Sequence, residues 1–89
     1  MIQRTVKIVN HAGMHTRPAS IIVKLAAKYK SDFYIIKDGD KINGKSIIGI
    51  MSLAAEYGSE LILQLDGPDE EKAADELAKY FNEGFGELQ

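Results

Sequence analysis

The sequence predicts a single two-layer α+β domain in which three helices cover one face of a four-stranded sheet. The 89 residues are 45% hydrophobic and 27% charged, an ordinary composition for one globular domain. Short segments with strand and helix periods follow one another in the order βαββαβα. Each predicted helix has one apolar face, which a sheet can bury. We therefore expect one domain over residues 1–89.

The first strand and the first helix are separated by a glycine-containing loop. Residues 2–9 form a short β-branched run, which favours a strand. Apolar residues then recur at helical spacing up to about residue 30. Pro18 fits only in the first helical turn, where amide groups have no intrahelical acceptor. The helix is therefore expected to begin at His15 or Thr16.

A hairpin and a short helix occupy the middle of the chain. Residues 33–36 and 41–43 are two strands, and the Asp-Gly-Asp sequence between them favours a turn. Ser46 stands at the N-cap position of a short helix, and Gly58 is the expected stop signal beyond it. This helix is the weakest of the three patterns because it contains Gly49 and several β-branched residues.

The last strand and the last helix complete the order. Residues 60–66 alternate between polar and apolar side chains, as a half-buried strand does. Asp69 is expected to cap the final helix, and Gly84 to end it. The apolar stripe of this helix consists of Ala73, Ala74, Leu77, Tyr80 and Phe81.

Composition excludes several classes of protein and partner. The chain has no cysteine, which removes disulfides and thiol nucleophiles and suits a reducing compartment, so the cytoplasm is the expected location. No run of about 18 apolar residues and no secretory signal pattern is present, so membrane insertion is not expected. Eleven basic against thirteen acidic residues give a net charge of −2, which argues against a nucleic-acid partner.

A histidine and an arginine stand at the predicted start of the first helix. The positive end of the helix dipole and its unpaired amides would hold an anion beside His15, and Arg17 could add a charged fork to it. A helix N-terminus also disfavours imidazolium, which makes neutral His15 a plausible nucleophile for transient phosphoryl transfer. The competing interpretation is that His15 only caps the helix and Arg17 is a solvated charge.

Other chemical interpretations of these motifs are weaker. His11 and His15 could supply two metal ligands, but no third ligand is near in the sequence, and we expect no metal and no cofactor. Gly44-Lys45-Ser46 suggests a phosphate-binding loop, but Gly39 lies in a hairpin turn and no long helix follows. A small phosphatase using Arg17 would need a water-positioning residue, and none is evident.

Ser46 precedes an apolar segment that one narrow helix stripe cannot bury completely. A serine at an N-cap is ordinarily structural, yet a phosphate there would be tolerated because it faces the positive end of the dipole. Because one narrow stripe cannot bury all the apolar residues of this helix, three of them are expected to remain partly exposed and to dock a partner: Ile47, Ile48 and Met51.

Two motifs carry a resemblance to a known family. Gly13-Met14-His15-Thr16-Arg17-Pro18-Ala19 is followed about thirty residues later by Gly44-Lys45-Ser46-Ile47-Ile48-Gly49-Ile50-Met51. Together they resemble the HPr family, the histidine-containing phosphocarriers of the bacterial phosphoenolpyruvate-dependent sugar phosphotransferase system. The resemblance covers the whole chain and implies an open-faced β-sandwich, with a four-stranded antiparallel sheet and three helices on one side.

The resemblance also implies roles for individual residues. His15 would accept a phosphoryl group on Nδ1 from phosphorylated enzyme I and pass it to enzyme IIA domains, so the protein would carry phosphate rather than act as a conventional enzyme. Arg17 and the Thr16 amide would stabilise the phosphohistidine. Ser46 would be the site of regulatory phosphorylation by the HPr kinase/phosphorylase, with a catabolite-control transcription factor as a further partner. The docking residues would be Ala12, Thr16, Ser20, Lys24, Ile47, Ile48, Gly49, Met51 and Ser52.

Several alternatives stay open at this point. Met14 stands where the family more often has Leu or Ile, and His11 and Ala12 are unusual in the loop. A carrier of the nitrogen-related phosphotransferase branch would share both motifs. A regulatory adaptor would act only through Ser46, although His15 argues against a paralogue that lacks the active histidine. A carrier that exchanges partners rapidly is expected to be a monomer.

Overall fold

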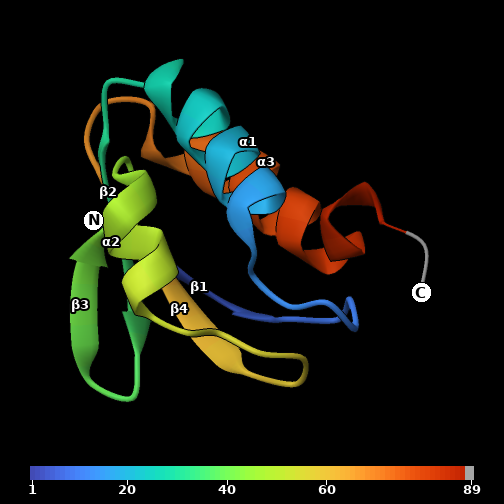
Figure 1. Cartoon of the computed structure of the whole chain (residues 1–89). Helices are drawn as coiled ribbons and strands as arrows, with labels where there is room; N and C mark the ends of the chain where they lie inside the picture. Colours follow the sequence, from blue (N-terminus) through green and yellow to red (C-terminus); the bar gives the residue numbers. More distant parts are fainter. Residues whose placement is uncertain (88–89) are drawn as a thin grey trace.

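Four antiparallel strands form one sheet in the computed structural model, which describes residues 1–87. Their order across the sheet is β1-β4-β2-β3, so the last strand in sequence lies between the first two (Figure 1). Leu65 of β4 pairs with Ile2 of β1 on one side and with Phe33 of β2 on the other. The strands are β1 (Ile2–Lys7), β2 (Asp32–Lys37), β3 (Asp40–Asn43) and β4 (Glu60–Asp66).

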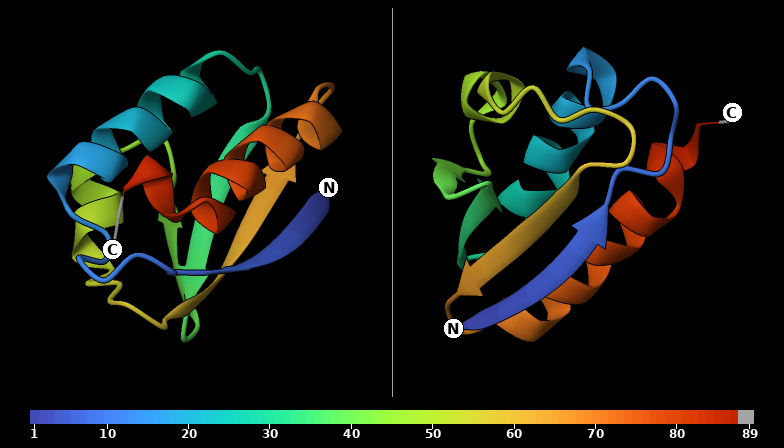
Figure 2. Two further views of the ribbon diagram at one scale, coloured as in Figure 1. Left: turned by 90° about the vertical axis from the view of Figure 1, so that its right-hand side faces the viewer. Right: turned by 90° about the horizontal axis from the view of Figure 1, so that it is seen from below.

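The helices lie on one face of this sheet. They are α1 (Thr16–Ala27), α2 (Ile47–Ser52) and α3 (Glu70–Asn82), and a short 3-10 turn, η1 (Gly84–Gly86), follows α3. Figure 2 shows α1 and α3 side by side over the sheet, with α2 beside α1. The predicted two-layer, open-faced architecture and its element order are confirmed. Within residues 1–87, no helix combines the length and apolar character that crossing a bilayer requires.

Strand alternation determines which side chains the helices bury. In β4, Leu61, Leu63 and Leu65 face the helices and are at most 1% exposed, whereas Ile62 and Gln64 between them are only half-buried. The buried core spans both layers. Its largest members are Phe33, Phe81, Phe85, Ile8, Ile22, Ile35, Ile50, Leu61, Leu63, Leu65 and Leu77.

The first helix begins where its sequence predicts. Thr16 is its first residue, and Pro18 lies in the first turn, where its missing N–H costs no hydrogen bond. The first intrahelical bond runs from the Ala19 amide to the His15 carbonyl at 3.1 Å. Ala19, Ile22 and other buried residues on one face pack into the core, which places His15 at the exposed start of α1.

The extent of α2 differs from the prediction. The helix ends at Ser52, well before the expected stop at Gly58. Ala54 has a positive φ of 50°, so the chain leaves the helical conformation soon after Ser52. Gly58 instead belongs to the turn before β4, where its amide donates to the Ile8 carbonyl at 2.8 Å. Likewise β1 ends at Lys7, two residues earlier than predicted.

Asp69 occupies the predicted N-cap position of α3, but the prediction that its side chain caps the helix was wrong. The carboxylate accepts hydrogen bonds from the amides of Lys30 and Ser31, at 2.8 and 3.0 Å, instead of from its own helix. The Glu70 carboxylate accepts from the Gly67 amide at 3.1 Å. The prediction failed because Asp69 found better-placed donors in a segment distant in sequence.

Candidate functional site

The loop before α1 holds His15 at the helix start. The Met14 amide donates to the Ala55 carbonyl at 2.9 Å, and the Gly13 amide donates to the Asn10 carbonyl at 3.1 Å. Gly13 has a φ of +73°, and a Cβ atom there would lie 3.0 Å from the Ala55 oxygen. This position therefore requires glycine, for both its backbone conformation and its close approach to the neighbouring segment.

His15 is the N-cap residue of α1, yet its side chain makes no capping hydrogen bond. The interpretation that His15 merely caps the helix is therefore wrong. Its side chain is 41% exposed, and that of Arg17 is 56% exposed. The His15 imidazole and the Arg17 guanidinium thus stand at the positive end of α1, where solvent and a partner can reach them.

A third side chain reaches this position from the far end of the described chain. Gly84, Phe85 and Gly86 all have positive φ values, so the backbone reverses direction after α3. The Phe85 ring is 1% exposed and packs against Tyr80 and Phe81, with ring centroids 5.2 and 5.1 Å apart. This anchored turn places Glu87 over the start of α1.

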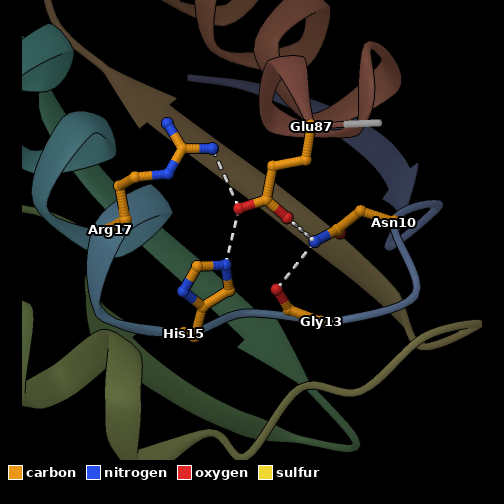
Figure 3. A network of polar contacts seen from close by, with 5 residues as sticks. All are labelled: Asn10, Gly13, His15, Arg17 and Glu87. Carbon is orange, nitrogen blue, oxygen red and sulfur yellow. Dashed lines mark hydrogen bonds and ion pairs between the residues drawn. The ribbon is translucent and has the colours of Figure 1, made fainter. Parts of the chain in front are cut away.

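The Glu87 carboxylate joins three side chains in one network, which we name the Glu87 cluster: Asn10, His15, Arg17 and Glu87 (Figure 3). Its Oε2 atom lies 2.6 Å from His15 Nε2 and accepts from Arg17 Nη2 at 2.9 Å. Its Oε1 atom accepts from Asn10 Nδ2 at 2.6 Å. Asn10 Nδ2 also donates to the Gly13 carbonyl at 3.0 Å, which ties the cluster to the loop.

The charge state of Glu87 fixes the direction of its contact with His15. Burial alone would raise the pKa of Glu87, but hydrogen bonds from Asn10, His15 and Arg17 outweigh burial and hold that pKa below its ordinary value. Glu87 is therefore a carboxylate at neutral pH and can only accept hydrogen bonds. It follows that His15 Nε2 carries the proton, and in the neutral ring Nδ1 then carries the free lone pair.

Two buried polar atoms near this cluster have no hydrogen-bond partner within residues 1–87. One is Asn10 Oδ1. The amide nitrogen of the same side chain donates to the Gly13 carbonyl and to Glu87 Oε1, and this orientation leaves Oδ1 without a donor. The other is the hydroxyl of Tyr80. Burial raises the pKa of Tyr80. The positive charge of Arg17 acts to lower this pKa, and the negative charge of Glu87 acts to raise it. Tyr80 therefore lies within the electrostatic field of the cluster.

Ser46 stands at the N-cap of α2, as its sequence predicts. Its Oγ accepts from the Gly49 amide at 3.1 Å, and the residue is half-buried. Ile47, Ile48 and Met51 are 40%, 84% and 38% exposed, and we name them the α2 patch. The predicted partial exposure is confirmed, whereas Ile50 is completely buried and anchors the helix.

The remaining predicted docking residues lie in the loop before α1, in α1 and in α2. Helices α1 and α2 contact each other, and Figure 2 shows α2 beside α1. Thr16, Lys24 and Ser52 are exposed, while Ser20 and Gly49 are half-buried. Ala12 is exposed in the loop and lines a hollow together with His11 and Tyr57. The rings of His11 and Tyr57 pack edge to face, with their centroids 4.8 Å apart.

Sequence reasoning missed Asn10 and Glu87. Asn10 lies in the loop before the first predicted helix, and Glu87 lies beyond the last one. One signal was available, because a phenylalanine between two glycines directly after a helix indicates an anchored turn. Among residues 1–87, no group of three or more histidine, aspartate or glutamate side chains is arranged to hold a metal ion.

Comparison with known proteins places this geometry in a family. The family model "PTS HPr component phosphorylation site" matches residues 2–83. The phosphocarrier protein HPr of Treponema pallidum (strain Nichols) is 41% identical over 87 residues, which are 98% of this chain and 99% of that protein. The HPr-like protein Crh of Bacillus subtilis (strain 168) is 42% identical over 83 residues, 93% of this chain and 98% of that protein.

The same family appears among solved structures. The crystal structure of HPr-C-His from Thermoanaerobacter tengcongensis matches with a TM-score of 0.95 and 40% identity, over 100% of both chains. The family model ends at residue 83, so Glu87 lies outside the matched segment. Since model, relatives and fold agree over nearly the whole length, the chain belongs to the HPr family of phosphocarriers of the phosphotransferase system.

Proposed function

We propose that His15 accepts a phosphoryl group on Nδ1 from phosphorylated enzyme I and passes it to enzyme IIA domains during sugar uptake. One observation carries the proposal. His15 Nε2 and Arg17 Nη2 meet at a single carboxylate oxygen of Glu87, so the guanidinium lies beside the His15 ring while the other ring nitrogen, Nδ1, stays free. A phosphoryl group on Nδ1 would be attached to the ring that Arg17 adjoins, and a cation beside that ring would stabilise its negative charge.

The transfer step uses groups that the chain already holds in place. The Nδ1 lone pair forms a bond to phosphorus, and the bond between phosphorus and the enzyme I donor breaks with its electron pair remaining on the donor. The proton on Nε2 stays where it is. The Arg17 guanidinium and the unpaired first-turn amides, that of Thr16 included, would stabilise the charge on the phosphoryl oxygens.

Partner docking is proposed for the surface that surrounds His15. The α2 patch supplies apolar area, and the start of α1 supplies polar and charged contacts around it. The docking residues are Ala12, Thr16, Ser20, Lys24, Ile47, Ile48, Gly49, Met51 and Ser52. Enzyme I and enzyme IIA domains would use this surface in turn, since both must reach the same histidine. A monomeric, cytoplasmic carrier suits such rapid exchange, and sedimentation equilibrium tests the monomer.

Regulation through Ser46 is a second element of the proposal. Ser46 is half-buried and borders the α2 patch, and its hydroxyl already serves the N-cap of α2. A phosphate from the HPr kinase/phosphorylase would add about two negative charges beside apolar contact area, which would weaken enzyme I docking. Ser46→Asp is expected to bind enzyme I more weakly with the fold retained, and equal affinity of the two forms would contradict this role. Binding to a catabolite-control transcription factor would be the corresponding gain.

The decisive experiment is the intact mass of the protein after incubation with phosphoenolpyruvate and enzyme I. One added phosphate is expected, which brief acid treatment removes and which His15→Ala lacks. No added phosphate with a verified donor would refute carriage from enzyme I. Repeating the assay with the donor of the nitrogen-related branch distinguishes that alternative, and incubation with ATP and the kinase tests a Ser46-dependent adaptor.

A further inference from the structure

We propose that Glu87 is a positioning residue for phosphoryl transfer, which keeps the proton of His15 on Nε2 and compensates the positive charge that the ring gains when Nδ1 bonds to phosphorus. This inference rests on the proposed function and adds a residue outside the segment that the family model matches. It assigns a chemical task to the carboxylate in Figure 3.

Glu87 fixes the hydrogen-bond geometry at the imidazole ring of His15. Glu87 Oε2 lies 2.6 Å from His15 Nε2, and an ionised carboxylate can only accept at that distance. The ring is therefore held with Nε2 protonated, and Nδ1 is left as the nucleophilic atom. Figure 3 shows the second ring nitrogen directed away from Glu87, so a phosphoryl group on Nδ1 and the carboxylate on Nε2 fit the same ring.

Glu87 also balances the charge that develops on the His15 ring during the reaction. When Nδ1 donates its lone pair to phosphorus, the ring becomes a cation that still carries the Nε2 proton. The Glu87 carboxylate beside that proton neutralises the new charge without taking the proton. When the phosphoryl group leaves for an acceptor, the Nδ1 electron pair returns to the ring and the starting pair is restored. The carboxylate of a serine protease triad performs the same two tasks for its histidine.

Glu87 is itself held in place by contacts on two sides. The Glu87 side chain is 14% exposed, far less than an ordinary surface partner. Asn10 is 1% exposed, and its Nδ2 atom donates to Glu87 Oε1. In this orientation the Oδ1 atom of Asn10 has no hydrogen-bond partner among residues 1–87. The Phe85 ring anchors the turn just before Glu87. Two independent attachments thus fix one carboxylate against one ring nitrogen.

The test compares Glu87→Gln and Glu87→Ala with the wild type and with Glu83→Gln, a matched control at an exposed glutamate four residues earlier. The first measurement is the rate of phosphorylation by enzyme I and phosphoenolpyruvate. We expect a loss of about 10- to 100-fold for both Glu87 variants, smaller than the roughly 10⁴-fold loss that a wrong tautomer causes in a buried triad. Glu83→Gln should keep the wild-type rate.

The second measurement is the ¹⁵N spectrum of the His15 ring, which a purely structural role would not change. The wild type should show a protonated Nε2 and an unprotonated Nδ1, and Glu87→Ala should shift both signals toward a mixture of the two tautomers. Glu87→Asp should restore part of both the rate and the spectrum. Thermal unfolding of each variant identifies any loss that is due to the fold alone.

The outcomes separate this inference from the proposed function. Phosphorylation of the wild type with no change in rate or spectrum for Glu87→Ala would overturn the role of Glu87 and leave His15 as the acceptor. Faster transfer in Glu87→Ala would also overturn it, because the carboxylate would then be competing with the phosphoryl group for Arg17. Absence of phosphorylation in the wild type would remove the proposed function and this inference together.

Discussion

Ser31 Oγ donates to Asp69 Oδ1 at 2.5 Å, and this bond connects the segment after α1 to the start of α3. The Ser31 hydroxyl, followed by the amides of Lys30 and Ser31, lowers the pKa of Asp69 below its ordinary value. One carboxylate thus fastens the two long helices to each other at their adjoining ends. This polar contact accompanies the direct contact between α1 and α3.

This contact makes the stability of the domain sensitive to acid. Because the folded-state pKa of Asp69 is lowered, its contribution is present above the ordinary aspartate pKa of about 3.9 and is lost as the pH falls through the lowered value. Ser31→Ala should raise the pKa of Asp69 and make unfolding less steeply dependent on pH in this window. An NMR titration of the carboxyl carbon measures the first effect. Ser52→Ala is the control, since its hydroxyl donates to Gly49 instead; an unchanged Asp69 titration in Ser31→Ala would contradict the assignment.

The contact between Gly44 and the Phe33 ring predicts a strong effect of one methyl group. A Cβ atom at Gly44 would lie 2.3 Å from a ring carbon of Phe33, which is 1% exposed and has no space to move into. Gly44→Ala should therefore lower the free energy of unfolding by about 1–3 kcal/mol. Denaturant unfolding measures the loss. Adding Phe33→Leu should recover part of it, and strictly additive losses in the double variant would show that the two residues are not in conflict.

The N-cap of α2 predicts different outcomes for two substitutions of Ser46. Ser46→Ala removes the acceptor for the Gly49 amide and should cost about 1 kcal/mol of stability. Ser46→Asp replaces it with another good N-cap acceptor beside the positive end of the helix, and should stay within a few tenths of a kcal/mol of the wild type. Thermal unfolding measures both. Wild-type stability of the alanine variant would show that the cap contributes nothing.

The place of Arg17 predicts a large effect of charge reversal on phosphoryl transfer. Arg17→Glu removes the cation beside His15 and puts a second carboxylate near Glu87. We expect at least about tenfold slower phosphorylation by enzyme I, since a hydrogen bond to a charged group contributes about 1.5–3 kcal/mol. Lys72→Glu makes the same change in net charge on the exposed face of α3. Equal rates for the two variants would mean that only overall charge matters.

Local sequence rules predicted most of the fold, because the elements have clear periods and end signals. Pro18 determined the first turn of α1, Gly84 marked the end of α3, and alternation in residues 60–66 identified β4. The same rules failed at Asp69 and at the end of α2. In both places a distant segment, or a residue with positive φ, overrode the local preference.

The candidate site was predicted only in part, for a physical reason. His15, Arg17 and Ser46 stand at helix starts, where spacing along the chain reveals their environment. Glu87 meets His15 only because Phe85 packs on α3 and the chain then reverses direction. No periodicity encodes a contact between residues so far apart in sequence. The loop residue Asn10 acquires its role from that same contact.

The position of β4 at the centre of the sheet governs how this domain assembles in time. Both of its neighbours precede it in the chain, and Leu65 must find Ile2 and Phe33 across long intervening segments. Closing such long segments costs chain entropy, and the favourable contacts between the paired strands form only afterwards. Assembly is therefore limited by the search for non-local strand pairs rather than by helix formation, and β1 and β2 cannot be joined into one sheet until β4 has arrived.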